Sequence, residues 1–169
     1  MGVPMTKVMP NLYIGNIRDA LNREQLKIHN ITHILAIHDR AKNMHENFVY
    51  HIVNVSDNCK TKISHVLPGC IKFIHNARVN NKCVLVHCLA GISRSSSVII
   101  AYIMVILKCS FDHALAILRE IRPVAKPNIY FALQLKNIDV DMVNLKVNES
   151  DKIQLESILK SGKKQQTLT

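Results

Sequence analysis

A cysteine and an arginine near the middle of the chain are spaced for phosphate chemistry. They lie in the stretch VLVHCLAGISRSSS, residues 84–97, where Cys88 follows a short apolar run and Arg94 precedes three serines. A thiolate is a strong nucleophile, and it forms more readily beside cations and at helix N-termini. The planar guanidinium of an arginine matches two oxygens of one phosphate. The pair therefore predicts attack of a cysteine sulfur on phosphorus, through a phosphocysteine intermediate.

The residues around this pair predict a strand, a loop and a helix. KCVLVH, residues 82–87, is a short apolar run typical of a central strand that is buried on both faces, and the serines after Arg94 begin a helix that is apolar nearly all round. Ligands of open α/β sheets bind at the carboxyl ends of the strands. The loop N–H groups can face an anion there, reinforced by the positive end of the helix. The predicted phosphate-binding residues are Leu89, Ala90, Gly91, Ile92, Ser93 and Arg94.

The rest of the chain alternates between apolar β-branched runs and segments with helical spacing. The predicted strands are residues 11–16, 31–38, 47–55 and 82–87. Besides the helix after the loop, the predicted helices are residues 19–27, 67–80, 111–122, 128–147 and 150–162. This alternation predicts an α/β fold: a single domain with a central, mostly parallel mixed sheet of about five strands flanked by helices. We expect the catalytic domain to span residues 1–147, followed by a short helix and a polar tail over 148–169.

The composition narrows the classes of function. Lys and Arg number 22 against 12 Asp and Glu, a net charge of +10 that favours anionic partners. Nucleic acid is not an expected partner, because the chain has no Trp and only 5% aromatic residues for stacking on bases. The five cysteines lack zinc-ligand spacing, so no metal or other cofactor is expected. The most apolar run, residues 98–107, is about half of a membrane span, and no signal peptide is evident, so we expect a cytoplasmic protein.

The loop and its flanks together resemble a known family. HCLAGISRS, residues 87–95, fits the HCx5R[S/T] signature of cysteine-dependent protein phosphatases, and its SRS ending is similar to the dual-specificity branch. MPNLYIGN, ITHILAIHD and KPNIYFALQL occur in the order expected of that family, so that the resemblance covers roughly residues 5–140. The chain is most similar to the atypical subgroup typified by the Jun-kinase-stimulatory phosphatase. The resemblance implies hydrolysis of phosphotyrosine and phosphoserine/threonine in proteins of kinase pathways.

The resemblance also implies a general acid in a loop some thirty residues before the nucleophile. Asp57 lies 88 − 57 = 31 residues before Cys88 and directly after a predicted strand. It is expected to protonate the leaving group and then to act as the base for water. Asp39, in the stretch AIHDR, is the rival acid, and we expect it to lie near the site for structural reasons.

Three further residues have roles that follow from the resemblance. Ser95 is expected to donate a hydrogen bond to the sulfur when it leaves, His87 to organise the loop, and Asn128 to brace it. The sequence departs from the family pattern beside Asn128, where Lys126 and Tyr130 stand in place of a small polar residue and a glycine. These departures put the shape of that wall in doubt, but not the chemistry.

The first residues, MGVPMT, fit the N-myristoylation pattern M-G-x-x-x-[ST] through Gly2 and Thr6. With the subgroup resemblance, this pattern predicts acylation of Gly2 and association with the cytosolic face of the membrane. A single myristoyl chain anchors only marginally, so a second signal is needed. The lysines of KSGKK, residues 160–164, can supply it, although a solvated tail also explains them.

Some alternatives stay open at this stage. The chain could act on phosphoinositides or other non-protein phosphates, although Leu89, Ala90 and Ile92 are apolar where lipid phosphatases of this kind tend to carry loop lysines. It could also be a catalytically silent module that binds phosphoproteins. Finally, Cys59 or Cys83 could form a protective disulfide with the loop cysteine under oxidation.

Overall fold

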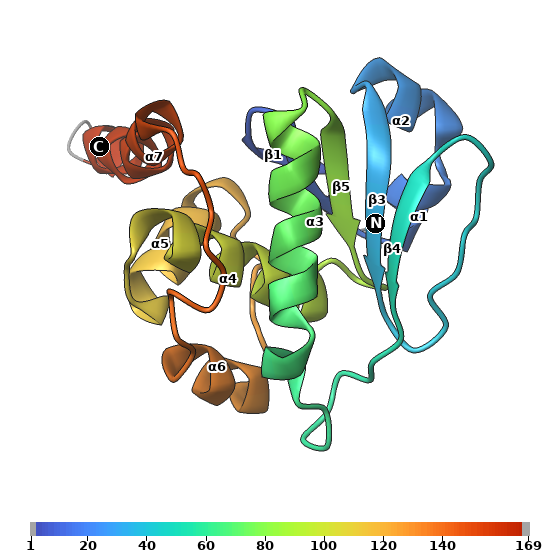
Figure 1. Cartoon of the computed structure of the whole chain (residues 1–169). Helices are drawn as coiled ribbons and strands as arrows, with labels where there is room; N and C mark the ends of the chain where they lie inside the picture. The colour runs from blue at the N-terminus through green and yellow to red at the C-terminus, as the bar shows by residue number, and fades with distance from the viewer. Residues whose placement is uncertain (1–2, 167–169) are drawn as a thin grey trace.

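Figure 1 shows a computed structural model of the chain, in which residues 3–166 are described. The strands are β1 (Thr6–Met9), β2 (Leu12–Gly15), β3 (Ile31–Ile37), β4 (Val49–Val53) and β5 (Cys83–His87). They form one sheet in the order β1-β2-β5-β3-β4, in which β1 is antiparallel to β2 and all other neighbours are parallel. The predicted α/β fold with a mixed, mostly parallel sheet of about five strands is confirmed.

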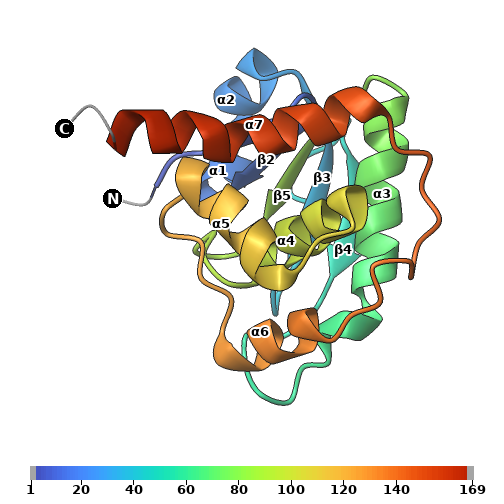
Figure 2. The same ribbon diagram turned by 90° about the vertical axis from the view of Figure 1, so that its left-hand side faces the viewer.

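Helices cover both faces of this sheet. They are α1 (Ile17–Leu21), α2 (Arg23–Ile28), α3 (Leu67–Val79), α4 (Arg94–Leu107), α5 (Phe111–Ile121), α6 (Ile129–Lys136) and α7 (Glu149–Gln166), with a short 3₁₀ turn, η1 (Ile63–His65), before α3. The pair α1 and α2 lies on one face, and α3 to α7 lie on the other (Figures 1 and 2). Helix α7 crosses the molecule along α5, far from α6 (Figure 2).

The central strands are apolar along their whole length because both of their faces are buried. Side chains alternate across a strand, so neighbouring residues enter different cores. Leu35, Val84 and Val86 belong to the large core under α3 to α7, whereas Ile34 and Leu85 pack with α1 and α2 in a smaller one. Strand β5, between β2 and β3, is therefore fixed on all sides, and so is the loop at its carboxyl end.

Helix α4 runs through the large core directly after that loop. All of its residues from Arg94 to Ile106 are buried. Of the helices in residues 3–166, none is by itself long and apolar enough to span a membrane, and α4 with α5 reaches that size only as a pair bent by 119°. The buried helix holds its N-terminus against the end of β5.

Two elements near the N-terminus differ from the prediction. The helix expected over 19–27 is a pair, because Asn22 has extended dihedral angles, ends α1 and caps α2 through the N–H of Gln25. Its start also lies earlier: Asn16 caps α1, and Asp19 completes the capping box instead of beginning the helix. Strand β1 was not predicted, because four residues with two polar side chains give too short a pattern.

The helix predicted over residues 128–147 begins after its Asn128 cap, as expected, but ends at Lys136. The extension was wrong. The next eleven residues include four Asn or Asp side chains, which compete with a helix by bonding to nearby backbone groups. The carboxylate of Asp139, for example, accepts the N–H of Asp141.

The last helix is longer than predicted and is anchored to the domain. It was expected to be short and to end near Gly162, but α7 has 18 residues and continues to Gln166. Gly162 does not end the helix, and it lies beside the exposed Glu120 carboxylate of α5. At the other end of α7, Asp151 forms a buried ion pair with Arg78 of α3. Helix α7 is therefore held on the domain by this ion pair and by its contacts with α5, α4 and β1.

Candidate active site

The loop between β5 and α4 is held by hydrogen bonds from neighbouring segments to its outward-facing carbonyl groups. The carbonyl of Leu89 accepts the first N–H of α1 at 3.2 Å, and that of Ile92 accepts the N–H of Lys126 at 2.9 Å. The carbonyl of Gly91 accepts Nε of Arg122 at 3.1 Å. Because the C=O and N–H of a peptide unit point in opposite directions, outward carbonyls turn the N–H groups of the loop inward. The backbone therefore has the form of the predicted phosphate cradle.

Gly91 is required at its place in this loop. Its φ of +70° lies in the left-handed region that side chains disfavour. A Cβ there would also lie 2.6 Å from Nη2 of Arg122 and 2.7 Å from the carbonyl oxygen of Gly15 at the end of β2. Its N–H donates to Sγ of Cys88 at 3.2 Å. The glycine thus lets the loop close tightly over the sulfur.

Cys88 lies at the bottom of the cradle, directly after β5. It is 2% exposed, and its Sγ is 3.2 Å from Oγ of Ser95 in the first turn of α4. The sulfur thus contacts one backbone N–H and one hydroxyl, and it sits at the positive end of a helix. The structure places the predicted nucleophile and the predicted hydrogen-bond donor in contact.

The geometry of β5 excludes one of the disulfides that the sequence left open. All five cysteines, which lie within the described residues, are free. Cys83 begins β5 and Cys88 directly follows it, five residues further on. At about 3.3 Å per residue their Cα atoms are roughly 16 Å apart, whereas a disulfide needs less than about 7 Å. Cys59, which is exposed, is not excluded by this argument.

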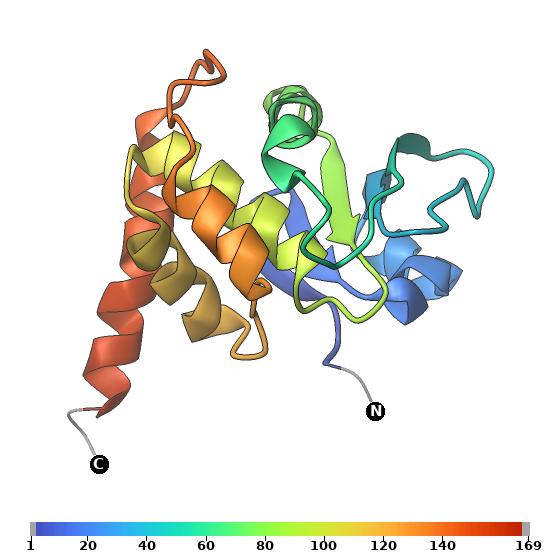
Figure 3. The same cartoon turned by 90° about the horizontal axis from the view of Figure 1, so that it is seen from below.

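Arg94 brings two aspartates to the cradle. Its side chain is buried, and Nη1 donates to Oδ2 of Asp39 at 2.7 Å and to the carbonyl of Val55 at 3.1 Å. Nε lies 4.0 Å from Oδ2 of Asp57. These partners follow the ends of β3 and β4, so three strand ends converge on the site. In Figure 3 the loop after β5 passes beside the segment that precedes α3.

Asp57 is tied to both walls of the site. Its Oδ1 accepts Oγ of Ser93 at 2.7 Å and Nδ2 of Asn128 at 2.6 Å, and its side chain is 33% exposed. Asn128 also donates its N–H to Oγ of Ser93 at 3.0 Å and caps α6 through the N–H of Phe131. The predicted acid and the predicted bracing residue are therefore in direct contact, and the brace acts through the serine of the loop.

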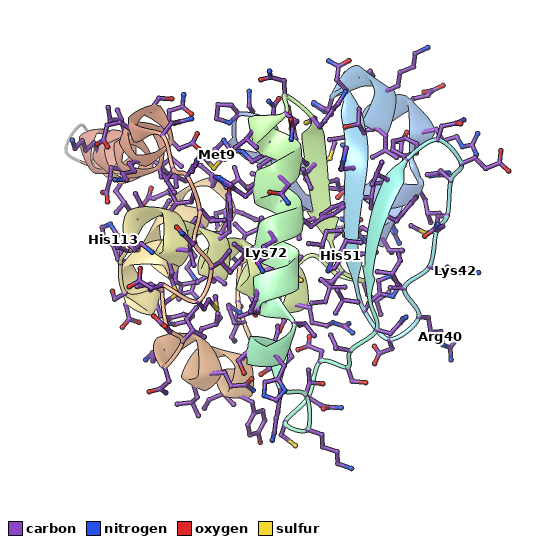
Figure 4. All side chains as sticks on the ribbon, in the orientation of Figure 1. Met9, Arg40, Lys42, His51, Lys72 and His113 are labelled. Carbon is purple, nitrogen blue, oxygen red and sulfur yellow. The ribbon has the colours of Figure 1, made fainter. Side chains whose placement is uncertain are left out.

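Asp39, the rival acid, is an ion-pair partner of Arg94. The hydroxyl of Ser56 and the guanidinium of Arg94 lower the pKa of Asp39 to about 2. The carboxylate is therefore ionised at neutral pH. The same loop between β3 and β4 carries Arg40 and Lys42, whose side chains point outward at the edge of the molecule (Figure 4).

His87 is fully buried behind the loop. Its Nδ1 donates to the carbonyl of Cys88 at 3.3 Å, and its ring packs against that of His38 with 5.6 Å between centroids. Burial, with a smaller contribution from His38, lowers the pKa of His87 to about 4. The imidazole is therefore neutral at pH 7, and its hydrogen bond fixes the peptide that precedes the loop.

Sequence reasoning missed Arg122, which lies behind the cradle. It is fully buried, and besides the carbonyl of Gly91 it binds the carbonyl of Pro4 at 2.9 Å and the hydroxyl of Thr6 at 2.8 Å. Burial lowers the pKa of its guanidinium. The only sequence signal is an arginine directly before the helix-ending Pro123. Two of its three partners are backbone carbonyls, which every residue type has, so the sequence gives no indication of them.

Both the sequence and the fold match known phosphatases. The family model of the dual specificity phosphatase catalytic domain matches residues 12–141. Human dual specificity protein phosphatase 22 is 41% identical over 139 residues, which cover 82% of this chain and 76% of that protein. Among solved structures, DUSP15 has a TM-score of 0.78 and 34% identity, over 92% of this chain and 97% of that one.

A second solved structure shares the fold under a different description. The human tyrosine phosphatase-like serine/threonine/tyrosine-interacting protein has a TM-score of 0.73 and 32% identity, over 78% of this chain and 93% of that one. The family follows from the catalytic-domain match and from the relative at 41% identity. The chain belongs to the dual-specificity protein phosphatase family, in the atypical Jun-kinase-stimulatory subgroup of human dual specificity protein phosphatase 22, and it hydrolyses phosphotyrosine and phosphoserine/threonine in proteins.

Proposed function

We propose that Cys88 is the nucleophile of this phosphatase, with Arg94 as the phosphate clamp, Asp57 as the general acid and base, and Ser95 as the donor to the leaving sulfur. The observation that carries this assignment is the position of the sulfur. It lies at the bottom of a loop whose N–H groups face inward, within 3.2 Å of Oγ of Ser95. Arg94 and Asp57 lie at the same loop.

In the first step the thiolate attacks phosphorus, forming the S–P bond as the ester P–O bond breaks. The carboxylic acid of Asp57 gives its proton to the departing oxygen of tyrosine, serine or threonine. Inward N–H groups and the Arg94 guanidinium hold the equatorial oxygens, where charge is spread in the transition state. The products are the dephosphorylated protein and phosphocysteine on Cys88.

In the second step water attacks the phosphocysteine and gives a proton to the Asp57 carboxylate. The S–P bond breaks and inorganic phosphate leaves. The charge that returns to the sulfur is stabilised by the hydroxyl of Ser95 and the N–H of Gly91, both at 3.2 Å. The cycle ends with the thiolate and with Asp57 protonated, so it is complete without a cofactor.

The structure offers a physical reason to prefer Asp57 over Asp39 as the acid. An acid must hold a proton at the working pH. The pKa of Asp39 is lowered to about 2 by Ser56 and Arg94, so this residue is ionised in any assay near neutrality. Asp57 instead faces Asn128 and Ser93 across the mouth of the cradle.

The acid assignment is tested with two leaving groups. Para-nitrophenolate leaves readily without a proton, whereas the serine alkoxide of a phosphoserine peptide does not. Asp57→Asn should therefore slow the phosphoserine peptide by about 10²-fold or more, and para-nitrophenyl phosphate much less. Asp39→Asn is the matched control, and it should change both substrates by the same small factor. A uniform loss in Asp57→Asn, or a leaving-group effect in Asp39→Asn, would reject the assignment.

The nucleophile is tested by rapid-mixing kinetics with a chelator present. With para-nitrophenyl phosphate, Ser95→Ala should release para-nitrophenolate in a burst, because loss of the hydroxyl beside the sulfur slows breakdown of phosphocysteine. Cys88→Ser should release none. Peptides carrying phosphotyrosine, or pThr-x-pTyr, test both specificities, and a phosphoinositide tests the non-protein alternative. Turnover of the lipid alone would refute the substrate class, and turnover by Cys88→Ser would refute the mechanism.

We also propose that the chain associates with the cytosolic face of a membrane through a myristoyl group on Gly2. The support is the sequence pattern together with the resemblance to the subgroup, since Gly2 lies outside the described residues. Thr6, the other marked position of the pattern, has a second use, because its hydroxyl accepts Nη1 of Arg122. Flotation of the acylated chain with anionic vesicles, compared with Gly2→Ala, tests the anchor. Equal flotation of both proteins would refute it.

A further inference from the structure

A cavity of about 410 Å³ lies against the outer wall of the phosphate cradle. It opens where the N-terminal segment, the start of α1, the loop and the segment after α5 come together. Its volume is in the range of ligand-binding clefts, and it is large enough for an amino-acid side chain. The lining residues are Val3, Asn16, Ile17, Arg18, Leu89, Ala90, Ile92 and Val124.

The cavity is continuous with the catalytic loop. Leu89 and Ile92 are 45% and 39% exposed, and both belong to the loop that surrounds Cys88. The backbone of this loop faces the sulfur, while its apolar side chains line the cavity outside. The cavity and the cradle share the loop residues Leu89, Ala90 and Ile92. In an extended peptide, successive residues follow one another at about 3.5 Å.

The chemistry of the lining selects an apolar occupant. Val3, Ile17 and Val124 extend the apolar surface beyond the loop, and Arg18 is the cation among the lining residues. An apolar side chain would be removed from water here, whereas a lysine or arginine would meet the like charge of Arg18. The walls of the cavity are also fixed, because the segments that form them are hydrogen-bonded to the loop. The first N–H of α1 donates to the carbonyl of Leu89, and the N–H of Lys126 donates to the carbonyl of Ile92.

We propose that this cavity is a substrate subsite, which binds an apolar side chain close to the phosphorylated residue of an extended phosphopeptide. The proposal rests on the assignment of Cys88 and its loop as the phosphate site. On this proposal the loop recognises two features of the substrate. Its inner side binds the phosphate, and its outer side binds an apolar residue next to the phosphorylated one.

The test measures kcat/KM on phosphotyrosine peptides in which leucine, serine or lysine stands in turn at each of the two positions before and after the phosphotyrosine. Wild type should prefer leucine over serine by about tenfold at one of these positions, with lysine poorest. Val124→Asp should abolish that preference, while Val124→Leu should keep it. Ile153→Asp, which also replaces a β-branched apolar side chain by a carboxylate but at a 62% exposed position on α7, is the control and should keep the preference.

Para-nitrophenyl phosphate, which has no neighbouring residues, separates the subsite from the chemistry. Its kcat/KM should be the same in wild type and Val124→Asp. Equal rates on all peptides in wild type, or a loss in Val124→Asp that is as large for para-nitrophenyl phosphate, would overturn the subsite. A preference that disappears when Gly2 is acylated would assign the cavity to the acyl chain and also overturn it. Failure of wild type on para-nitrophenyl phosphate would instead reject the proposed function.

Discussion

Two arginine–aspartate pairs in this protein differ in how completely the arginine is satisfied. Arg78 donates to both carboxylate oxygens of Asp151, at 3.0 and 2.9 Å, and also reaches the hydroxyl of Tyr102 and the carbonyl of Pro10. Arg94 reaches one oxygen of Asp39 at 2.7 Å. Its buried Nε has no hydrogen-bond partner among the described residues.

The two pairs also differ in their access to water. The side chains of Arg78 and Asp151 are 6% and 8% exposed, so neither can change partner without leaving a charge buried. Asp39 is 44% exposed and can turn to solvent without leaving its charge buried. The same two residue types therefore form a fixed anchor for α7 and, at the proposed phosphate clamp, a pair whose carboxylate has access to water.

The largest effect on activity is expected from Arg94→Lys. Lysine keeps the positive charge but cannot hold two phosphate oxygens at once. We expect kcat/KM on para-nitrophenyl phosphate to fall by about 10³-fold. The urea midpoint should barely change, because Asp39 keeps a cationic partner. A loss below tenfold would show that the loop N–H groups alone bind the phosphate. Arg94 would then not differ from Arg78 by a role in phosphate binding.

The opposite result is expected from Asp151→Ala. Removing this carboxylate leaves the buried Arg78 without a counter-charge, so the free energy of unfolding should fall by about 3 kcal/mol. Urea unfolding measures this loss. Activity at low temperature should be unchanged, because α7 packs on α5, α4 and β1, and the hydrogen bonds of Arg78 go to Asp151, Tyr102 and Pro10.

The exposed pair of Lys108 and Asp141 supplies the control for that measurement. Its side chains are 49% and 76% exposed. Asp141→Ala should therefore cost less than about 1 kcal/mol. Equal losses in the two variants would mean that burial does not distinguish the pairs.

His87 extends the comparison to a buried base without a carboxylate partner. Its pKa is about 4 in the folded protein, mainly through burial, and near 6.5 when unfolded, so below pH 6.5 the unfolded chain binds the extra proton. Stability is therefore lost as the pH falls. Between pH 7.5 and 5 this residue should contribute a loss of about 2 kcal/mol.

His87→Gln removes that proton site and tests the contribution. Urea unfolding at the two pH values should show a smaller loss for the variant than for the protein that keeps His87. The histidines that do not contact His87 are common to both proteins and cancel in the difference. His38, whose ring packs against that of His87, is replaced by Gln in both proteins so that only His87 differs. Parallel losses would show that His87 does not titrate between the folded and unfolded states.

The parts of the site that could be predicted are those with a one-dimensional signal. Cys88, Gly91 and Arg94 have a fixed spacing at the end of an apolar strand, and Asp57 follows the end of another. The sheet could be predicted for the same reason, since its buried central strands are continuous apolar runs. The signals of the loop and of the strands depend only on near neighbours in the sequence, whereas the choice of Asp57 also needed the resemblance to the family.

What could not be predicted depends on distant backbone groups. Arg122 acts on the carbonyls of Gly91 and Pro4, and any residue type provides a carbonyl. The four residues of β1 are defined by pairing with β2, not by their own pattern. Helix α6 ends where Asn and Asp side chains compete with the helix, although the apolar spacing continues beyond Lys136.

The smallest effect is expected from Asp39→Asn, which tests directly whether Asp39 and phosphate compete for Arg94. If Asp39 holds the place of the phosphate at Arg94, a neutral amide should compete less for the guanidinium. Inorganic phosphate should then inhibit the variant about two- to fivefold more tightly than wild type, as expected for a half-exposed ion pair. Because Ser56 and Arg94 lower the pKa of Asp39 to about 2, the carboxylate is ionised from pH 5 to 8, and the factor should be constant over that range.

The direction of the change separates two roles for this carboxylate. If Asp39 competes with phosphate for Arg94, weakening the pair should make phosphate bind more tightly. If Asp39 instead orients the guanidinium of Arg94 for phosphate, removing the carboxylate should make phosphate bind less tightly. Weaker inhibition of Asp39→Asn by phosphate would therefore make Asp39 a positioning residue. It would then be a fixed partner of its arginine, as Asp151 is of Arg78. Tighter inhibition would mean that the free enzyme keeps Arg94 paired until substrate arrives, because a buried guanidinium with unused donors needs a counter-charge in both states.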